Sequence, residues 1–386
     1  MKTTLQQFLD TQKANHLYRA RAVVDSPQAA ELLIDGKSYL NFCSNDYLGH
    51  ANHPKLAEAF INGVRQYGVG SGASHLISGH SRAHHELEEA LAAFVGRPRA
   101  LLFSTGYMAN LGVISALLNK GDHVFEDRIN HASLLDGGLL SQARLQRYLH
   151  ADARDLLNKL GASKAQTKLV ASDGVFSMDG DLAPVKALAS AAQRHNAWLM
   201  IDDAHGLGVV GERGRGVLEL LSITNAEVPI LVGTLGKAFG TFGAFVAGND
   251  DLIETLIQKA RSYIYTTALP PAIAVATLAS LRLIDDEAWR RDRLRENVRL
   301  FRELASQAKI PLSDSETAIQ PVILGDVEPT LQVSHGLKQQ GILVTAIRPP
   351  TVPQGTARLR ITMSAEHTSA QITRLIETLH TLGVGQ

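Results

Sequence analysis

The spacing of hydrophobic and polar positions changes several times along the chain. Alternating residues from Glu31 to Phe42, interrupted by Asp35-Gly36, predict a β-hairpin with a tight turn. Apolar positions at helical spacing predict amphipathic helices over residues 1–25, Pro54–Tyr67 and His80–Phe94. The first quarter of the chain is therefore predicted to hold helices and one hairpin.

From Arg99 onward, short apolar runs alternate with helical patterns such as Ala109–Leu118 and Pro184–His195. Near-continuous apolar runs are typical of strands that are buried on both faces of a sheet. The predicted strands are Ala100–Ser104, His123–Glu126, Leu145–Leu149, Lys168–Ser172, Trp198–Asp202, Ile230–Thr234 and Gly243–Ala247. This alternation predicts an α/β domain around a mainly parallel seven-stranded sheet.

After about residue 283 the pattern changes to a long charged helix at Asp286–Gln307 and a final helix at Ala370–Leu382. Shorter strands are predicted between them, at Ile319–Leu324, Ile342–Ala346 and Ala357–Thr362. We interpret this part as a smaller α+β lobe. The expected organisation is an N-terminal helix and hairpin at 1–45, a large α/β domain at 46–283 and a C-terminal domain at 284–386.

Composition narrows the functional class. The 386 residues are 45% apolar and 20% charged, and Lys+Arg and Asp+Glu both number 38. Zero net charge argues against nucleic acid and anionic membranes as partners. Cys43 is the only cysteine, which fits a reducing cytoplasmic setting. The polar N-terminus does not resemble a signal peptide. The sequence contains no run of 18 apolar residues, the length needed to span a membrane. We expect a soluble cytoplasmic enzyme.

A candidate nucleophile, Lys237, lies in the stretch Thr234-Leu-Gly-Lys-Ala-Phe-Gly240, directly after a predicted buried strand. Burial lowers the pKa of a lysine towards the nucleophilic neutral amine. The stretch alone favours a solvated loop lysine. A P-loop fits less well, because Leu231 replaces its first glycine and Ala238 replaces the magnesium-binding Ser/Thr. The lysine therefore needs support from other segments.

Other polar segments follow the predicted strands, where open α/β sheets bind their ligands. They are Ser104-Thr-Gly-Tyr107, Asn130-His131, Asp173-Gly-Val-Phe-Ser177 and Asp202-Asp-Ala-His205. Asp202 ends a buried strand and needs a cationic partner, such as a protonated pyridine nitrogen. Lys237 offers an amine for a Schiff base, and Gly106 leaves backbone amides free to hold a phosphate. Together these are the requirements of pyridoxal 5′-phosphate.

Two further motifs match a dinucleotide site and a metal site only in part. Gly206-Leu-Gly-Val-Val-Gly211 matches a dinucleotide fingerprint, but the following Glu212-Arg-Gly-Arg-Gly216 cannot open the required helix. His80 and His84 are four residues apart and have the spacing of a metal-binding pair. The sequence suggests no third ligand nearby, so we interpret them as solvated helix residues and predict no metal site.

The chain as a whole resembles the α-oxoamine synthases. The resemblance is carried by Asn41–Gly49, Asp173–Gly180, Asp202–Gly206, Thr234–Gly240 and Leu359–Thr362, and covers nearly the whole chain. It implies a fold-type I pyridoxal-phosphate-dependent transferase that condenses an amino acid with an acyl thioester and releases CO2. It also implies a homodimer with shared active sites.

One branch of this family matches best. The stretch Val344–Pro353, continued by Gly355–Arg360, is similar to the family members of biotin biosynthesis. The resemblance implies L-alanine and a pimeloyl thioester as substrates, the thioester being carried by acyl carrier protein or coenzyme A.

The resemblance assigns roles around the cofactor ring. Lys237 is implied as the Schiff-base lysine and Asp202 as the partner of the pyridinium nitrogen. His131 is implied to stack on the ring, to contact the substrate and to help protonate intermediates. Ser177 and His205 are implied to lie near the phenolic oxygen of the cofactor.

It also assigns roles to the cofactor's phosphate and to the substrates. Gly106, Tyr107 and Thr234 are implied as phosphate contacts, and Thr266 as a contact to the phosphate of the neighbouring subunit. Arg360 is similar to the arginine that holds the amino acid carboxylate in a bidentate pair. The remaining implied substrate contacts are Arg19, Thr351 and Asn45.

Some points stay open at this stage. Asp173 stands where related proteins have Glu, and Gly72-Ala-Ser-His75 replaces the usual run of paired glycines, which leaves His75 without a role. A synthase that uses glycine, making 5-aminolevulinate or 2-amino-3-oxobutyrate, is an alternative. So is a non-catalytic cofactor-binding regulator, although a regulator would have no use for Arg360. Sphingolipid-type condensation is disfavoured, because nothing in the sequence suggests a membrane-facing surface.

Overall fold

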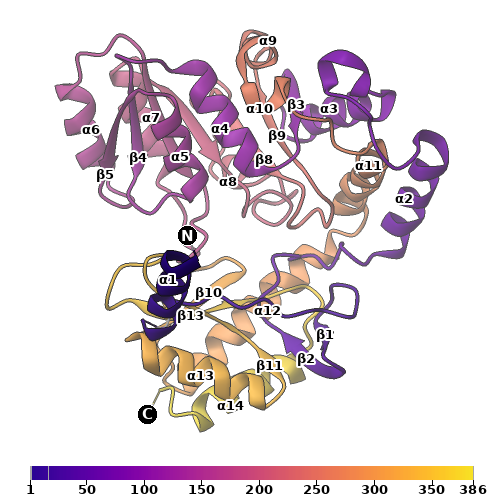
Figure 1. The fold of residues 1–386 in the computed structure, drawn as a ribbon, viewed down its shortest axis with the longest axis vertical. Helices are drawn as coiled ribbons and strands as arrows, with labels where there is room; N and C mark the ends of the chain where they lie inside the picture. Colours follow the sequence, from indigo (N-terminus) through magenta and orange to yellow (C-terminus); the bar gives the residue numbers. More distant parts are fainter. Residues whose placement is uncertain (1, 16, 386) are drawn as a thin grey trace. The chain divides into compact units, whose positions relative to one another are not determined.

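The computed structural model describes residues 2–15 and 17–385, and its elements are labelled in Figure 1. The chain forms two compact units. The larger unit holds residues 50–177 and 181–291, and the smaller unit holds residues 1–49, 178–180 and 292–386. The predicted division at residues 45 and 283 stays a prediction; in these units, the N-terminal hairpin groups with the C-terminal segment.

A seven-stranded sheet forms the centre of the larger unit, in the order β3-β9-β8-β7-β6-β4-β5. Its strands are β3 (Arg99–Phe103), β4 (His123–Asp127), β5 (Arg144–Tyr148), β6 (Lys168–Asp173), β7 (Trp198–Asp202), β8 (Ile230–Thr234) and β9 (Ala244–Gly248). The pairs from β5 through β4, β6 and β7 to β8 are parallel, and β9 is antiparallel to both of its neighbours. The predicted α/β class and mainly parallel sheet are confirmed.

The core of the larger unit lies between this sheet and its helices. Val124, Val232 and Val246 on the strands pack in one cluster with Val113 and Ile114 of helix α4. The helices of the unit are α2 (Pro54–Tyr67), α3 (Arg82–Phe94), α4 (Gly106–Leu117), α5 (Ala132–Leu140), α6 (Ala153–Ala162), α7 (Val185–Arg194), α8 (Val217–Leu220), α9 (Asp250–Lys259), α10 (Arg261–Ile264) and α11 (Pro271–Asp286). A π-helical turn, η1 (His75–Gly79), precedes α3.

Side-chain caps fix where several of these helices begin. The Thr105 hydroxyl accepts the Met108 amide at the start of α4, and the Asp152 carboxylate accepts two amides of α6. Such caps satisfy backbone donors that a helix cannot satisfy internally. The start of α4 is therefore set by the sequence itself, which matters for the site described below.

The smaller unit holds two three-stranded sheets. The predicted hairpin pairs β1 (Glu31–Ile34) with β2 (Lys37–Asn41), and β11 (Ile342–Leu343) adds to β2 in parallel. Its turn places Asp35 and Gly36 at φ of 49° and 72°, the left-handed region that glycine adopts readily. The second sheet has β13 (Ala357–Thr362) between β10 (Ile319–Gly325) and β12 (Thr345–Ile347).

Several sequence-based boundaries of the smaller unit were wrong. Helix α1 (Lys2–Ala14) ends well before residue 25, and the strand predicted at 342–346 is two short strands in different sheets. Helix α13 (Val327–Gln339) was not predicted, because Pro329 and Gly336 interrupt its pattern. The other helices are α12 (Trp289–Gln307) and α14 (Ser369–Thr381).

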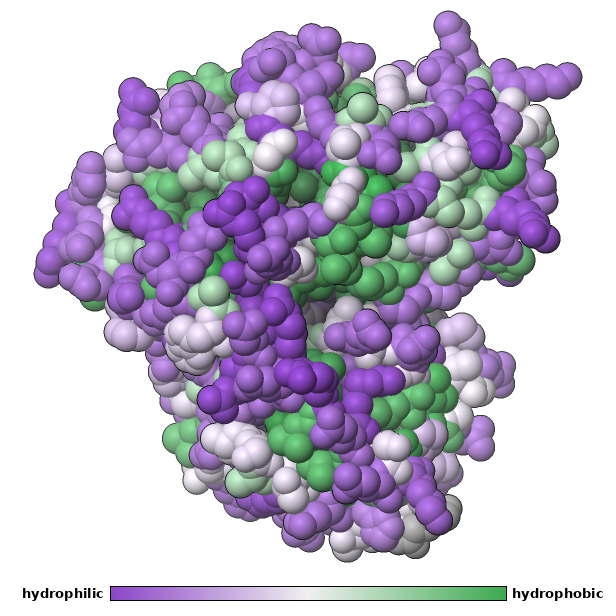
Figure 2. All heavy atoms as spheres, turned by 180° about the vertical axis from the view of Figure 1, so that it is seen from behind, coloured by the Kyte–Doolittle hydropathy of each residue, from purple (hydrophilic) through white to green (hydrophobic). Residues whose placement is uncertain are grey.

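Polar and charged side chains separate the apolar patches on the face seen in Figure 2. Within residues 2–15 and 17–385, no helix has both the length and the apolar character needed to cross a membrane.

A histidine between two carboxylates ties together loops at the edge of the large sheet. His150 Nδ1 lies 3.1 Å from Asp127 Oδ1, and its Nε2 lies 2.9 Å from Asp181 Oδ2. Burial opposes the charged ring, but the hydrogen bonds to both carboxylates outweigh it and raise the pKa of His150 to about 10. The His150 ring also packs edge-on against Phe176, 4.5 Å between centroids, next to the predicted site residue Ser177.

The contribution of His150 to stability should therefore depend on pH. Its folded pKa lies above the ordinary value of 6.5, so the stabilisation is complete below pH 6.5 and declines as the pH rises towards 10. We expect His150→Gln to lower the free energy of unfolding by about 1–2 kcal/mol at pH 6 and by less at pH 10. Urea unfolding at both pH values measures this, with the exposed His335→Gln as control. An equal loss at both pH values would contradict the charged pair.

Candidate active site

Polar loops at the carboxyl ends of the large sheet line a cavity of about 170 Å³ in the larger unit. Most of the residues predicted for the cofactor site are in its wall, namely Gly106, Tyr107, His131, Ser177, Asp202, His205, Thr234 and Lys237. Ser133, Asp173 and Ala204 complete the described lining. The structure thus brings together residues that are as much as 131 positions apart in the sequence, from Gly106 to Lys237.

Lys237 follows β8, and its amine lies against His205, which follows the neighbouring strand β7. The distance from Lys237 Nζ to His205 Nε2 is 2.7 Å. His205 is 8% exposed, and Lys237 is half-buried. An amine held by a buried imidazole is not the freely solvated loop lysine that the sequence alone allowed.

Asp202 ends β7, and its carboxylate is fixed from two sides. Its Oδ2 accepts a hydrogen bond from Asn110 Nδ2 at 2.6 Å, and its Oδ1 accepts the Ala204 amide at 3.1 Å. Asn110, 1% exposed on α4, also donates to Ser133 Oγ at 2.8 Å. These bonds orient the carboxylate while it remains on the wall of the cavity.

Sequence reasoning missed Asn110 and Ser133. A signal was present, because Asn110 is a polar residue in the middle of an otherwise largely apolar helix. Buried polar side chains need hydrogen-bond partners, so an asparagine at such a position indicates a polar neighbour. The sequence could not show that this neighbour is Asp202, which is 92 residues away.

Asp173, whose role the sequence left open, positions the loop that carries His131. It pairs with Asp202 in the register of β6 and β7, and its Oδ2 accepts the His131 backbone amide at 2.7 Å. Burial, followed by the nearby charge of Asp202, raises the pKa of Asp173 well above its ordinary value. A second negative charge beside Asp202 is therefore disfavoured on this wall, and a cation in the cavity would relieve that repulsion.

The ring of His131 is held at the N-terminus of α5. Its Nδ1 lies 2.8 Å from Ser133 Oγ, and the Tyr107 ring packs edge-on at 6.4 Å between centroids. Desolvation lowers the pKa of His131, and Lys237 lowers it further, whereas Asp202 acts in the opposite direction. The ring is therefore neutral at pH 7, suited to stacking or to donating one hydrogen bond.

Helix α4 begins at Gly106 on the wall of this cavity, which makes its N-terminus a candidate anion site. The first amides of a helix have no partner inside it and carry the positive end of the helix dipole. A Cβ added at Gly106 would meet nothing within 4 Å, so the space before this helix is open. Thr234 lies on the same cavity and donates its hydroxyl to the Gly243 carbonyl at 3.1 Å. Thr266 is not among the described residues that line this cavity.

The residues of this cavity fit pyridoxal 5′-phosphate. The paired carboxylates offer a partner for a cationic ring nitrogen, Lys237 offers an amine, and the start of α4 offers amides to a phosphate. These are the requirements that the sequence predicted, now present in one cavity.

Apart from His131, the residues predicted to bind the substrates lie in the smaller unit. Arg360, 8% exposed on β13, donates through Nη2 to Asn45 Oδ1 at 3.1 Å and through Nη1 to Thr362 Oγ1 at 3.2 Å. Arg19 and Thr351 line a different cavity of about 490 Å³. The structure therefore brings Asn45 to Arg360, and Arg19 to Thr351.

The interpretation of His84 as a solvated residue was wrong, whereas the His80 side chain is 29% exposed. His84 is fully buried, and its Nε2 donates to the Leu269 carbonyl at 2.7 Å. A third imidazole, His75, lies close to both, although the sequence suggested no third ligand. The turn η1 folds His75 back towards α3, which the sequence spacing did not reveal.

The comparisons with known proteins agree with this fold and site. The sequence matches the family Aminotransferase class I and II over residues 37–379. The chain belongs to this family.

Curated relatives extend the match along nearly the whole chain, and those described here are all named 8-amino-7-oxononanoate synthase. The protein of Nitrosococcus oceani is 63% identical over 96% of this chain and 98% of its own length. That of Methylococcus capsulatus is 63% identical over 95% of both chains, and that of Saccharophagus degradans is 56% identical over 98% of this chain and 96% of its own.

Solved structures show the same architecture. A serine palmitoyltransferase from S. paucimobilis with a bound PLP–myriocin aldimine is 33% identical, with a TM-score of 0.93 over 98% of this chain and 96% of that one. The 8-amino-7-oxononanoate synthase from Francisella tularensis is 34% identical, with a TM-score of 0.79 over 89% of this chain and 97% of that one. The predicted fold-type I class is confirmed.

Asn110 should act on cofactor binding through Asp202. We expect Asn110→Ala to weaken the affinity for pyridoxal phosphate by about 10- to 100-fold, because it removes the donor that orients a buried carboxylate. Cofactor retention after dialysis, followed by absorbance, measures the effect. Ser115→Ala on the same helix is the control, since its hydroxyl bonds only the Leu111 carbonyl among the hydrogen bonds described. Unchanged retention in Asn110→Ala would refute this role.

Proposed function

We propose that this chain uses pyridoxal 5′-phosphate to condense L-alanine with a pimeloyl thioester, which releases CO2 and gives 8-amino-7-oxononanoate for biotin biosynthesis. The observation that carries this proposal is the identity of 56–63% to synthases of that name along nearly the whole chain. Serine palmitoyltransferases share the fold at only 33% identity. The cavity around Lys237 supplies the chemistry that such a reaction needs.

The cofactor would be held between the start of α4 and the carboxylate of Asp202. Bound pyridoxal phosphate supplies an electron sink for negative charge at the α-carbon of the amino acid. Gly106, Tyr107 and Thr234 bind its phosphate end, Ser177 and His205 contact the ring oxygen, and the neutral His131 stacks on the ring.

Lys237 is the group that moves the proton. Its amine would hold the cofactor and, once alanine has displaced it and left it free, would accept the α-proton of alanine at Nζ. His205 holds that amine in place through the 2.7 Å contact. Asp202 provides the negative field that keeps a pyridine nitrogen protonated.

The substrates are held by the predicted groups of the smaller unit. Arg360 binds the alanine carboxylate through its planar fork, and Asn45 fixes the orientation of that fork. Arg19 and Thr351 contact the acyl chain. The thioester carrier is acyl carrier protein or coenzyme A, and the reaction takes place in the cytoplasm.

A homodimer with shared sites is supported by exposed apolar side chains near Thr266. Val69, Ile77 and Tyr265 are 81%, 80% and 71% exposed. The segments that carry them adjoin, since the Ala268 amide donates to the Ala73 carbonyl at 3.0 Å. Exposed apolar clusters of this kind mark protein interfaces. Thr266 would then reach the phosphate bound in the neighbouring subunit.

A panel of amino acids and acyl thioesters tests the proposed reaction. We expect product only from L-alanine with pimeloyl-acyl carrier protein or pimeloyl-coenzyme A, identified by mass, and none with glycine or serine. Lys237→Ala is the control and should lose turnover by at least about 1,000-fold, because the chemistry needs its amine. A preference for glycine would instead favour a 5-aminolevulinate or 2-amino-3-oxobutyrate synthase.

The role of Arg360 can be tested by keeping its charge and removing its fork. We expect Arg360→Lys to reduce kcat/KM for alanine by about 100-fold, mostly through KM, because lysine cannot form the bidentate pair. KM for the thioester should change little. Steady-state kinetics with each substrate varied in turn makes the distinction, and an unchanged KM for alanine would place the carboxylate elsewhere.

A further inference from the structure

A second cavity in the larger unit, of about 430 Å³, is lined by a cluster of imidazoles and carboxylates. None of the described residues in its wall also lines the cavity around Lys237. His75, His80, His85 and Glu88 are among them. The reaction proposed above makes no use of these side chains.

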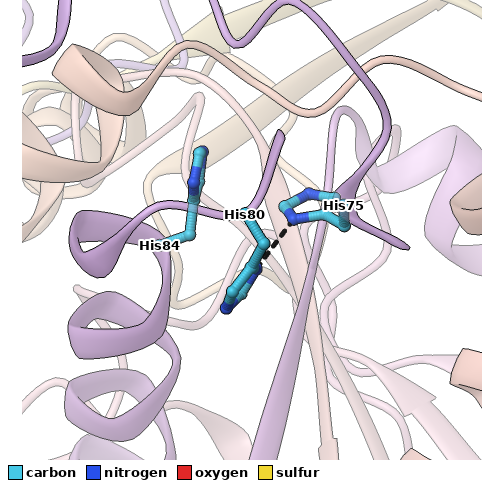
Figure 3. A group of neighbouring side chains, drawn as sticks. All are labelled: His75, His80 and His84. Carbon is cyan, nitrogen blue, oxygen red and sulfur yellow. Dashed lines mark hydrogen bonds between the residues drawn. The ribbon is translucent and has the colours of Figure 1, made fainter. Parts of the chain in front are cut away.

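The hydrogen bonds of the cluster decide which nitrogens can accept a metal ion. Figure 3 shows His75, His80 and His84, with the contact that joins the first two. His84 has no lone pair to offer, since its Nε2 must donate to the Leu269 carbonyl and its Nδ1 accepts the Ser81 amide at 3.0 Å. The set of three histidines is therefore not a ligand set, although their nitrogens lie within 4.8 Å of one another.

His80 is differently placed, because one nitrogen is occupied and the other is available. Its Nδ1 lies 3.0 Å from His75 Nδ1, so one of the two rings donates to the other. When His80 is the donor, its Nε2 carries a lone pair. That Nε2 lies 4.0 Å from Glu88 Oε2, too far for a direct hydrogen bond.

Glu88 and His85 complete a set of three ligands. They are three residues apart on α3, which places them on one face of the helix. Ligand atoms of His80, His85 and Glu88 all lie within 4.8 Å of one another. The other oxygen of Glu88, Oε1, accepts the Leu102 amide at 2.9 Å, which fixes the carboxylate.

We propose that His80, His85 and Glu88 bind a divalent transition-metal ion of the zinc type, and that His75 orients His80 as its hydrogen-bond partner. Two imidazoles and one carboxylate suit such ions. Metal–ligand bonds of about 2.1 Å each span at most about 4.2 Å, so the 4.0 Å gap between His80 and Glu88 is within reach. A tetrahedral site needs about 3.4 Å between ligand atoms, so this gap would close by about half an ångström. The pairs that include His85, which lie within 4.8 Å, would close by at most about 1.4 Å through rotation of the exposed His85 side chain. The cavity leaves room for a water as fourth ligand.

Electrostatics favour a cation at this position. A metal ion would compensate the buried carboxylate. It would also join the turn before α3 to α3 itself and, through Leu102, to β3, so bound metal should stabilise the larger unit.

The test uses the chelator-treated holoenzyme titrated with ZnCl2 by isothermal calorimetry, with metal content measured after desalting. We expect about one ion per chain and a rise in Tm on adding zinc. His85→Asn and Glu88→Gln should each weaken the affinity by at least about 10-fold, and His75→Asn by about 10- to 100-fold. His335→Asn, an exposed histidine in the smaller unit, should bind as the unaltered protein does.

His85→Asn is the deciding variant, because the His85 side chain is 51% exposed and its replacement leaves no buried gap. Glu88→Gln keeps an acceptor for the Leu102 amide and removes only the charge. No saturable binding at 100 µM zinc (~10⁻⁴ M, weaker than sites of this ligand type), or the same affinity in both variants as in the unaltered protein, would overturn the proposal.

Discussion

A buried carboxylate is costly unless its charge is held, and the ends of β6 and β7 carry two of them side by side. Asp173 and Asp202 are paired in the sheet register, so neither can move away from the other without breaking the ladder. Asp173 accepts a hydrogen bond from the His131 backbone amide, and Asp202 accepts one from the side-chain amide of Asn110. The negative field that these hydrogen bonds do not compensate faces the cavity, where it favours a cationic ring.

The other residues of the site are placed around these two carboxylates. His205 follows the same strand as Asp202, and Lys237 follows the neighbouring strand β8, so their side chains meet on the same wall. His131 is held there because its own backbone amide binds the second carboxylate. A single electrostatic arrangement therefore sets the positions of Asp202, His131 and Lys237.

Much of this could be predicted from the sequence, since buried strands and the polar residues that follow them are local patterns. The strands from Arg99 to Gly248 were found for this reason. What local patterns could not give were partners distant in sequence. In the sequence, Asn110 is only a polar residue within an apolar helix. Asp173 is only an acidic residue that stands where related proteins have Glu. His75 had no role until the turn η1 placed it against His80.

Helix α4 has a consequence of its own for the geometry of the site. Its first residue, Gly106, opens the anion site, and its fifth, Asn110, holds the carboxylate of Asp202. Four residues of α-helix advance by about 6 Å. The helix therefore fixes the distance between the helix start at Gly106 and the carboxylate of Asp202. A molecule whose anionic and cationic ends are spaced differently cannot bind at both places at once. Helix α4 thus selects ligands by their length, and this selection does not depend on the side chains that carry out the chemistry.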